Sequence, residues 1–243
     1  MQRYFIYFSY DGANYHGWQI QPNGISVQEK LQTSLSLLLR TPLEVVGAGR
    51  TDAGVHARMM VAHFDCDASL DCGQLAYKLN KILPADISVE KVVPVESDKH
   101  ARFSAKWRTY HYYIHTCKDP FVRNYSCELH YPLDFQAMNA AAACLLKQDD
   151  FASFCKAGAD VKTTLCEVTA ACWHQTSPHH WYFEITANRF LRNMVRAVVG
   201  TLIEVGRGRM TLQEFEQVIA DKRRTSAGES MPGHALFLEQ IDY

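Results

Sequence analysis

The chain has 243 residues, of which 47% are hydrophobic, and its formal net charge at pH 7 is −1. That length fits one large domain or two small ones, and the apolar content is sufficient for a core, which excludes a disordered chain. The near-zero charge excludes a large basic field, so any binding to nucleic acid must depend on local basic surface.

Eight cysteines are spread through the chain without a C-x-x-C pair. No segment has the pattern of a signal peptide or the apolar length of a membrane span. This cysteine usage favours reduced, buried thiols and lacks the paired spacing of a structural zinc site. We therefore expect a cytoplasmic protein with no membrane segment and no metal.

The first half of the chain predicts the order strand, helix, two strands, helix, strand. Ser26 and Glu29 form a capping-box pattern that opens the first helix. This β-α-β-β-α-β order is that of a split, ferredoxin-like unit. The predicted elements cover residues 3–10, 27–40, 43–46, 59–66, 71–82 and 87–95.

The second half repeats this alternation of strands and helices. Asp134 and Asn188 are predicted N-caps, and Thr211 with Glu214 forms a second capping box. We expect an α+β protein with two pseudo-symmetric halves resembling ferredoxin or RRM domains, residues 1–104 and 105–243. Each half has a mainly antiparallel sheet with helices on one face, and a basic cleft lies between the halves. The predicted elements of the second half cover residues 106–116, 135–146, 165–173, 181–187, 189–205, 212–222 and 235–241.

A glycine-rich loop, residues 47–57, lies between two predicted strands and carries Arg50, Asp52 and His56. Its glycines allow tight turns or the close approach of a ligand. A carboxylate beside an arginine is held ionised and can act as a nucleophile toward a sugar or an electrophilic ring carbon. The ordinary alternative for Asp52 is a turn residue whose side chain bonds its own backbone. A metal site formed by Asp52, His56 and His63 is a further alternative.

Two other segments combine basic and aromatic side chains. On the strand 106–116, Arg108, Tyr110 and Tyr112 share one face, where a nucleobase could stack, although core packing is the commoner use of tyrosines in strands. In the helix predicted over 189–205, three arginines share one stripe, which is either a phosphate-binding ridge or a solvated face. These arginines are Arg189, Arg192 and Arg196.

Taken together, these stretches resemble the tRNA pseudouridine synthase A family. The most specific match is Gly49-Arg50-Thr51-Asp52-Ala53-Gly54-Val55-His56-Ala57, which is similar to the active-site motif of that family essentially residue for residue. The resemblance spans nearly the whole chain, because further matches follow the same order. They cover residues 10–12, 16–19, 26–28, 80–87, 101–105, 108–112, 150–154 and 190–208.

This resemblance implies that Asp52 is the catalytic aspartate, Tyr110 the tyrosine that stacks on uracil, and Arg196 the active-site arginine. It implies an isomerase that converts uridine to pseudouridine at positions 38, 39 and/or 40 of the tRNA anticodon stem-loop. It also implies a homodimer that needs no metal or organic cofactor. As substrate-binding residues we expect Arg50, His56, Arg58, Arg108, Arg189 and Arg192.

The residues suit this chemistry, in which uracil leaves the ribose, rotates and rejoins it through carbon 5. The target base must leave the stack, Tyr110 can support it afterwards, and an ion pair from Arg196 would orient Asp52. The sequence leaves open whether Asp52 attacks the base, attacks the sugar or assists elimination. The alternatives are a catalytically silent tRNA-binding or RNA-chaperone module, a metal-dependent hydrolase, and a pseudouridine synthase for another RNA. Two departures from the family pattern, residues 231–236 and Leu165, leave room for an altered tRNA range or for a second copy with a narrowed role.

Overall fold

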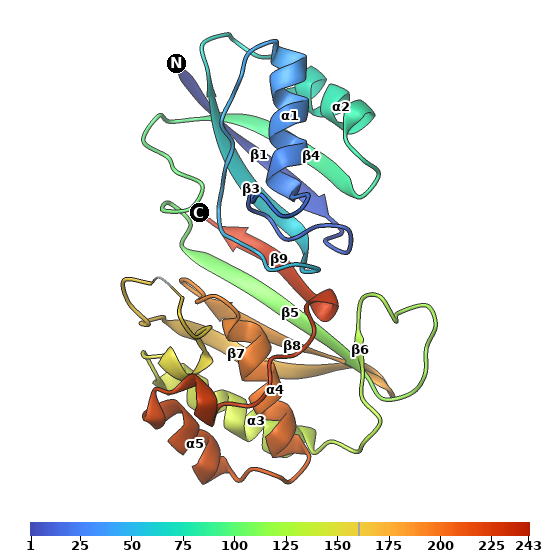
Figure 1. The fold of residues 1–243 in the computed structure, drawn as a ribbon, viewed down its shortest axis with the longest axis vertical. Coiled ribbons are helices and arrows are strands. Elements are labelled where there is room, and N and C mark those ends of the chain that lie inside the picture. The colour runs from blue at the N-terminus through green and yellow to red at the C-terminus, as the bar shows by residue number, and fades with distance from the viewer. Residues whose placement is uncertain (160) are drawn as a thin grey trace. The chain divides into compact units, whose positions relative to one another are not determined.

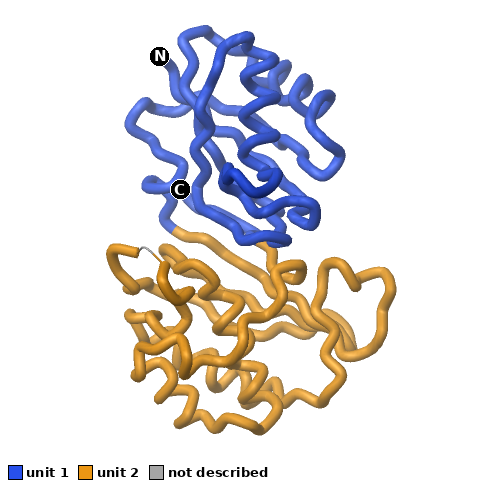
Figure 2. Tube along the Cα trace, viewed as in Figure 1, with its two compact units in different colours: residues 1–106, 238–243 blue, residues 107–237 orange. Residues whose placement is uncertain are grey.

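The computed structural model describes residues 1–159 and 161–243, which form two compact units (Figure 2). Unit 1 contains residues 1–106 and 238–243, and unit 2 contains residues 107–237. The predicted boundary between residues 104 and 105 is close to this division. The sequence-based division places residues 238–243 in the second domain, whereas in the structure they belong to unit 1.

Unit 1 is an antiparallel sheet with two helices. Strand β1 pairs with both β3 and β4, and β2 pairs with β3, so the strand order is β4-β1-β3-β2. This is the arrangement of a split βαββαβ unit, and the predicted order of elements is confirmed here. Both helices lie on the same face of the sheet (Figure 1). The elements are β1 (Gln2–Tyr10), α1 (Val27–Leu39), β2 (Val46–Gly47), β3 (His56–Cys66), α2 (Cys72–Ile82) and β4 (Ile87–Val95), with part of β9 (Leu236–Asp242).

The first helix of unit 1 begins at its predicted cap, Ser26, and Asp71 caps the second helix. The backbone N–H of Glu29 donates to the Ser26 hydroxyl at 3.2 Å, and the N–H of Gln74 donates to the Asp71 carboxylate at 3.0 Å. Each cap satisfies a backbone donor that the first helical turn leaves without a partner. On α1, Leu31 is fully buried in the core of unit 1.

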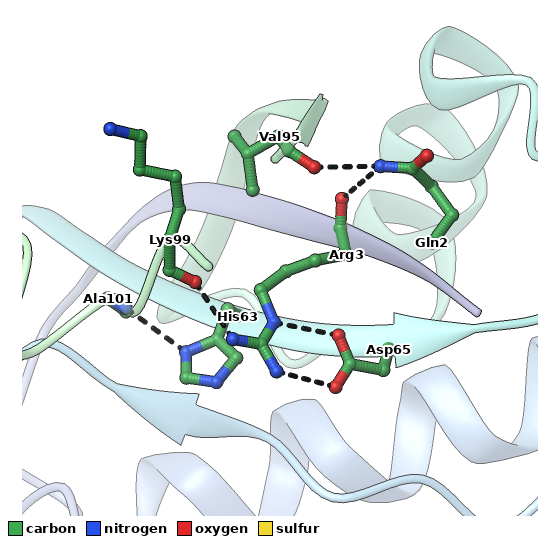
Figure 3. A network of polar contacts seen from close by, with 7 residues as sticks. All are labelled: Gln2, Arg3, His63, Asp65, Val95, Lys99 and Ala101. Atoms are coloured by element: carbon green, nitrogen blue, oxygen red, sulfur yellow. Dashed lines mark hydrogen bonds and ion pairs between the residues drawn. The ribbon is translucent and has the colours of Figure 1, made fainter. Parts of the chain in front are cut away.

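On the other face of the sheet, a polar network ties residues 99–101 to β1 and β3 (Figure 3). The Arg3 guanidinium donates to both carboxylate oxygens of Asp65 at 2.8 Å, and it also donates to the Lys99 carbonyl at 2.9 Å. The hydrogen bond from Arg3 holds the pKa of Asp65 below its usual value. Nδ1 of His63 accepts the N–H of Ala101 at 3.2 Å.

This position gives His63 an effect on stability that depends on pH. Burial, with help from His100 and Arg3, lowers the pKa of His63 from 6.5 to about 4. The unfolded chain therefore binds a proton below about pH 6.5 that the folded chain does not bind until about pH 4. Stability from neutral His63 is present above pH 6.5 and is lost as the pH falls toward 4.

We expect the His63→Asn variant to be less sensitive to acid than the wild type. Asparagine keeps an acceptor for the Ala101 N–H but does not titrate. Between pH 7 and pH 5, urea denaturation should show the wild type losing about 2 kcal/mol of unfolding free energy relative to the variant. A difference between the two proteins that stays constant over this range would contradict the assignment.

The strands of unit 2 form a mainly antiparallel stretch of sheet, in which β8 pairs antiparallel with both β5 and β7, and the short β6 pairs parallel with β5. Helices α3, α4 and α5 gather on one side of it (Figure 1). The element order of unit 2 resembles that of unit 1. The predicted pseudo-symmetry of the two halves and the predicted basic cleft between them stay predictions. The elements are β5 (Trp107–His115), β6 (Cys127–Glu128), α3 (Phe135–Cys144), β7 (Val168–Ser177), β8 (His180–Ala187), α4 (Met194–Gly206) and α5 (Leu212–Asp221).

The predicted caps at Asp134 and at Thr211 with Glu214 are confirmed, the latter as a complete capping box. The prediction that Asn188 caps a helix starting at Arg189 is wrong, because α4 begins at Met194. The Asn188 side chain instead accepts the N–H of Glu167 at 3.0 Å. None of the helices in residues 1–159 and 161–243 has the length and apolar character needed to cross a membrane.

Candidate active site

The Asp52 loop connects β2 to β3 and is held by main-chain contacts with residues 10–18. The carbonyl of Thr51 accepts the N–H of Trp18, and the carbonyl of Tyr15 accepts the N–H of Gly54, both at 3.3 Å. The Thr51 hydroxyl also lies 2.8 Å from the hydroxyl of Tyr10. These contacts fix the loop on both sides of Asp52, which is itself partly exposed.

Two glycines make this close backbone packing possible. A Cβ on Gly17 would lie 2.2 Å from the Thr51 carbonyl oxygen, and a Cβ on Gly12 would lie 2.0 Å from that of Val55. Gly17 also has a φ of 89°, which favours glycine. The sequence marks residues 10–12 and 16–19 as matched stretches, but it does not reveal that their glycines support the Asp52 loop.

His56, the first residue of β3, directly follows this loop, and only 1% of its surface is exposed. Its Nδ1 accepts the N–H of Gly12 at 3.0 Å and lies 2.9 Å from Oδ1 of Asp11. The neutral ring can accept from Gly12, whereas donating to Asp11 requires a proton on the same nitrogen. In either state His56 joins the Asp52 loop to residues 11–12, so the structure gives it a supporting position, and direct contact with substrate stays a prediction.

The two remaining basic candidates of unit 1 are exposed. Arg50 lies in the loop itself, two residues before Asp52. Arg58 lies on β3, where its Nε donates to the carboxylate of Glu239 at 3.1 Å. Both side chains are accessible to a polyanion in solution.

Unit 2 carries the candidates from the strand β5. Tyr110 is 9% exposed, and its ring meets Phe190 edge to face, with centroids 5.0 Å apart. Arg108 donates to the carbonyl of Asn188 at 2.7 Å. Tyr112 is fully buried and donates its hydroxyl to the Pro232 carbonyl at 3.0 Å. Core packing is therefore the right interpretation for Tyr112, whereas Tyr110 and Arg108 contact the segment that follows β8.

The expected stripe of three helical arginines is wrong. Only Arg196 lies on α4, and Arg189 and Arg192 lie on the segment between β8 and α4. The helix starts late because Asn193 adopts a left-handed conformation, with a φ of 68°, directly before its first turn. The Nε of Arg196 donates to the carbonyl of Met231 at 2.6 Å.

The predicted site residues are thus divided between the units, with Arg50, Asp52, His56 and Arg58 in unit 1 and the others in unit 2. Within the part of the chain that the structure describes, no three His, Cys, Asp or Glu side chains are placed to hold a metal ion. The chemistry that these residues offer is a partly exposed carboxylate in unit 1, and an aromatic ring and guanidinium groups in unit 2. These are groups that can attack, stack on and bind a nucleotide.

Comparison with known proteins agrees with this chemistry. A family model described as tRNA pseudouridine synthase matches residues 6–104 and 141–243. Tyr110 lies outside the matched residues, whereas Asp52 and Arg196 lie within them.

The chain is also similar over its whole length to curated proteins. It is 57% identical to the tRNA pseudouridine synthase A of Bacteroides fragilis, with 100% of this chain and 97% of that protein covered. It is 56% identical to that of Bacteroides thetaiotaomicron, with coverage of 100% and 91%. It is 54% identical to that of Parabacteroides distasonis, with coverage of 100% and 96%. The chain therefore belongs to the tRNA pseudouridine synthase family, and it is an isomerase that converts uridine to pseudouridine.

Proposed function

We propose that this protein converts uridine to pseudouridine at positions 38, 39 and/or 40 of the tRNA anticodon stem-loop. The observation that carries the proposal is Asp52, a partly exposed carboxylate on a loop that main-chain contacts hold on both sides. The names of the relatives, which are tRNA pseudouridine synthases A, support tRNA as the substrate.

In the proposed reaction the target uridine leaves the base stack and Tyr110 stacks on its uracil. Asp52 starts the reaction, by attacking the base, attacking the sugar or assisting elimination. The bond between N1 and C1′ breaks, the uracil rotates, and a bond forms between carbon 5 and C1′. Carbon 5 loses its proton and N1 gains one, so no oxidant or reductant is needed. Arg196 supplies positive charge for this reaction.

The other substrate-binding candidates have supporting roles in this proposal. Arg50 lies near the flipped base, while Arg58, Arg108, Arg189 and Arg192 contact the RNA. We further propose that the enzyme acts in the cytoplasm as a homodimer, without a metal or organic cofactor.

Release of tritium from tRNA labelled at carbon 5 of uridine tests the proposal directly. We expect the enzyme to release tritium from transcripts with a labelled uridine at position 38, 39 or 40, and not from a transcript with cytidine at all three. Tritium release that continues in the presence of a chelator would exclude the metal-dependent hydrolase. Binding of tRNA without release from any transcript would favour the silent binding module or another RNA substrate.

The arginines that precede α4 allow a separate test of RNA contact. If Arg192, which is exposed, binds a phosphate, the Arg192→Ala variant should bind tRNA more weakly at low salt. The slope of log affinity against log salt concentration should also decrease by about 1. Lys78→Ala, which removes an exposed charge on α2, is the matched control and should leave the slope unchanged. An unchanged slope for Arg192→Ala would make this arginine a solvated side chain.

A further inference from the structure

The segment between α5 and β9 runs back past α4 (Figure 1). Its residues 227–232, which we call the strap, lie directly on the helix backbone. The N–H of Gly228 donates to the Thr201 hydroxyl at 2.9 Å, and the N–H of Met231 donates to the Arg196 carbonyl at 3.1 Å. A Cβ on Gly200 would lie 1.8 Å from the carbonyl oxygen of Glu229, so only glycine allows this approach.

The strap determines how the Arg196 side chain is held. Its Met231 carbonyl accepts from Nε of Arg196 at 2.6 Å, while its Met231 N–H binds the carbonyl of the same residue. A guanidinium is a rigid planar fork, so a bond to Nε also sets the direction of its terminal nitrogens. A shift of the strap would therefore move the charged end of Arg196.

Arg224 also holds the strap in place. Its guanidinium donates to the carbonyls of Ala227 at 3.3 Å and Gly228 at 3.0 Å, and to the Ser230 hydroxyl at 2.8 Å. The Ser230 hydroxyl also accepts from the side chain of Asn193, the residue at which α4 begins, at 2.5 Å. One guanidinium thus organises the strap, and Ser230 joins it to the start of the helix that carries Arg196.

We propose that Arg224 and Ser230 are positioning residues for Arg196: they fix the strap so that the Met231 carbonyl orients the Arg196 guanidinium for the isomerisation. The inference rests on the proposed function, in which Arg196 takes part in the reaction. Met231 acts through its main chain, which does not depend on which side chain it carries.

The test uses single-turnover tritium release from carbon-5-labelled tRNA, with the whole chain. Arg224→Gln and Ser230→Ala remove hydrogen bonds of the strap without touching Arg196. We expect each to reduce the rate of the chemical step by about 10- to 100-fold, because small displacements of a reacting group have effects of that size. The dissociation constant for tRNA should stay within about threefold. Arg223→Gln, which removes the neighbouring exposed arginine, should keep the wild-type rate.

A double-mutant cycle distinguishes positioning from a general loss of structure. If Arg224 acts through Arg196, the double variant Arg224→Gln with Arg196→Gln should release tritium no more than about twofold more slowly than Arg196→Gln alone. Rate losses that multiply in the double variant would overturn the proposal, as would a wild-type rate in Arg224→Gln. Should Arg224→Gln fail to fold, the same cycle with Ser230→Ala decides, and a wild-type rate in that variant likewise overturns it.

The controls separate this inference from the proposed function. Release by the wild type shows isomerisation, and slow release by Arg196→Gln shows that the arginine takes part. If Arg196→Gln retains the wild-type rate, the assigned role of Arg196 fails. If Arg196→Gln is slow but Arg224→Gln and Ser230→Ala are not, only the role of the strap fails.

Discussion

Replacing Asp52 with asparagine should abolish tritium release while leaving the affinity for tRNA within several-fold of the wild-type value. The amide has nearly the shape of the carboxylate, so the main-chain contacts of Thr51 and Gly54 that hold the loop are preserved. An amide, however, is neither a nucleophile nor a base of useful strength. We expect the rate to fall by more than about 10³-fold, as it does when other enzymes lose a residue of this kind.

The matched control is Asp98→Asn, which neutralises an exposed aspartate of the same unit. This variant should release tritium at the wild-type rate, which would show that the loss is not an effect of net charge. Equal melting temperatures for the two variants would show that both are folded. Substantial residual turnover in Asp52→Asn would remove Asp52 from the nucleophile role.

The second large effect is expected from Gly17→Ala, although Gly17 carries no chemistry. The added Cβ would collide with the Thr51 carbonyl oxygen at 2.2 Å, and alanine disfavours the φ of 89° that this position requires. Relief of the collision must move the backbone beside Asp52. We expect a loss of about 2–4 kcal/mol in the free energy of unfolding, measured by urea denaturation, together with strongly reduced tritium release.

Gly49→Ala, in the Asp52 loop itself, provides the comparison, because a Cβ there would meet no atom within 4 Å. Its free energy of unfolding should stay within about 0.5 kcal/mol of the wild-type value. Equal denaturation midpoints for the two glycine variants would contradict the structural account of Gly17.

Local signals in the sequence predict most of the secondary structure. Ser26, Asp71, Asp134 and Thr211 each cap a helix where the sequence places one, because a cap needs only neighbouring residues. The start of α4 is the exception. Asn188 looks like a cap, but its side chain binds the N–H of Glu167, a residue distant in the chain, and the helix begins only after Asn193. A competing long-range hydrogen bond cannot be predicted from local pattern.

In the candidate site, too, local patterns could be predicted from the sequence, whereas contacts between distant segments could not. The sequence alone indicates Asp52, because a carboxylate beside an arginine in a glycine-rich loop is a local pattern, and the family motif around it is continuous. The sequence also marks His56. It does not reveal that His56 is buried, because the partners Asp11 and Gly12 lie on another segment of the chain.

The sequence by itself therefore determined the family of this protein, the order of its main elements and the loop that carries its reactive carboxylate. Each of these depends on residues that are close together in the chain. Only the tertiary structure decided which glycines support that loop, where α4 begins, and how Arg224 and the strap hold Arg196. Those features arise from hydrogen bonds and steric contacts between segments that only folding brings together.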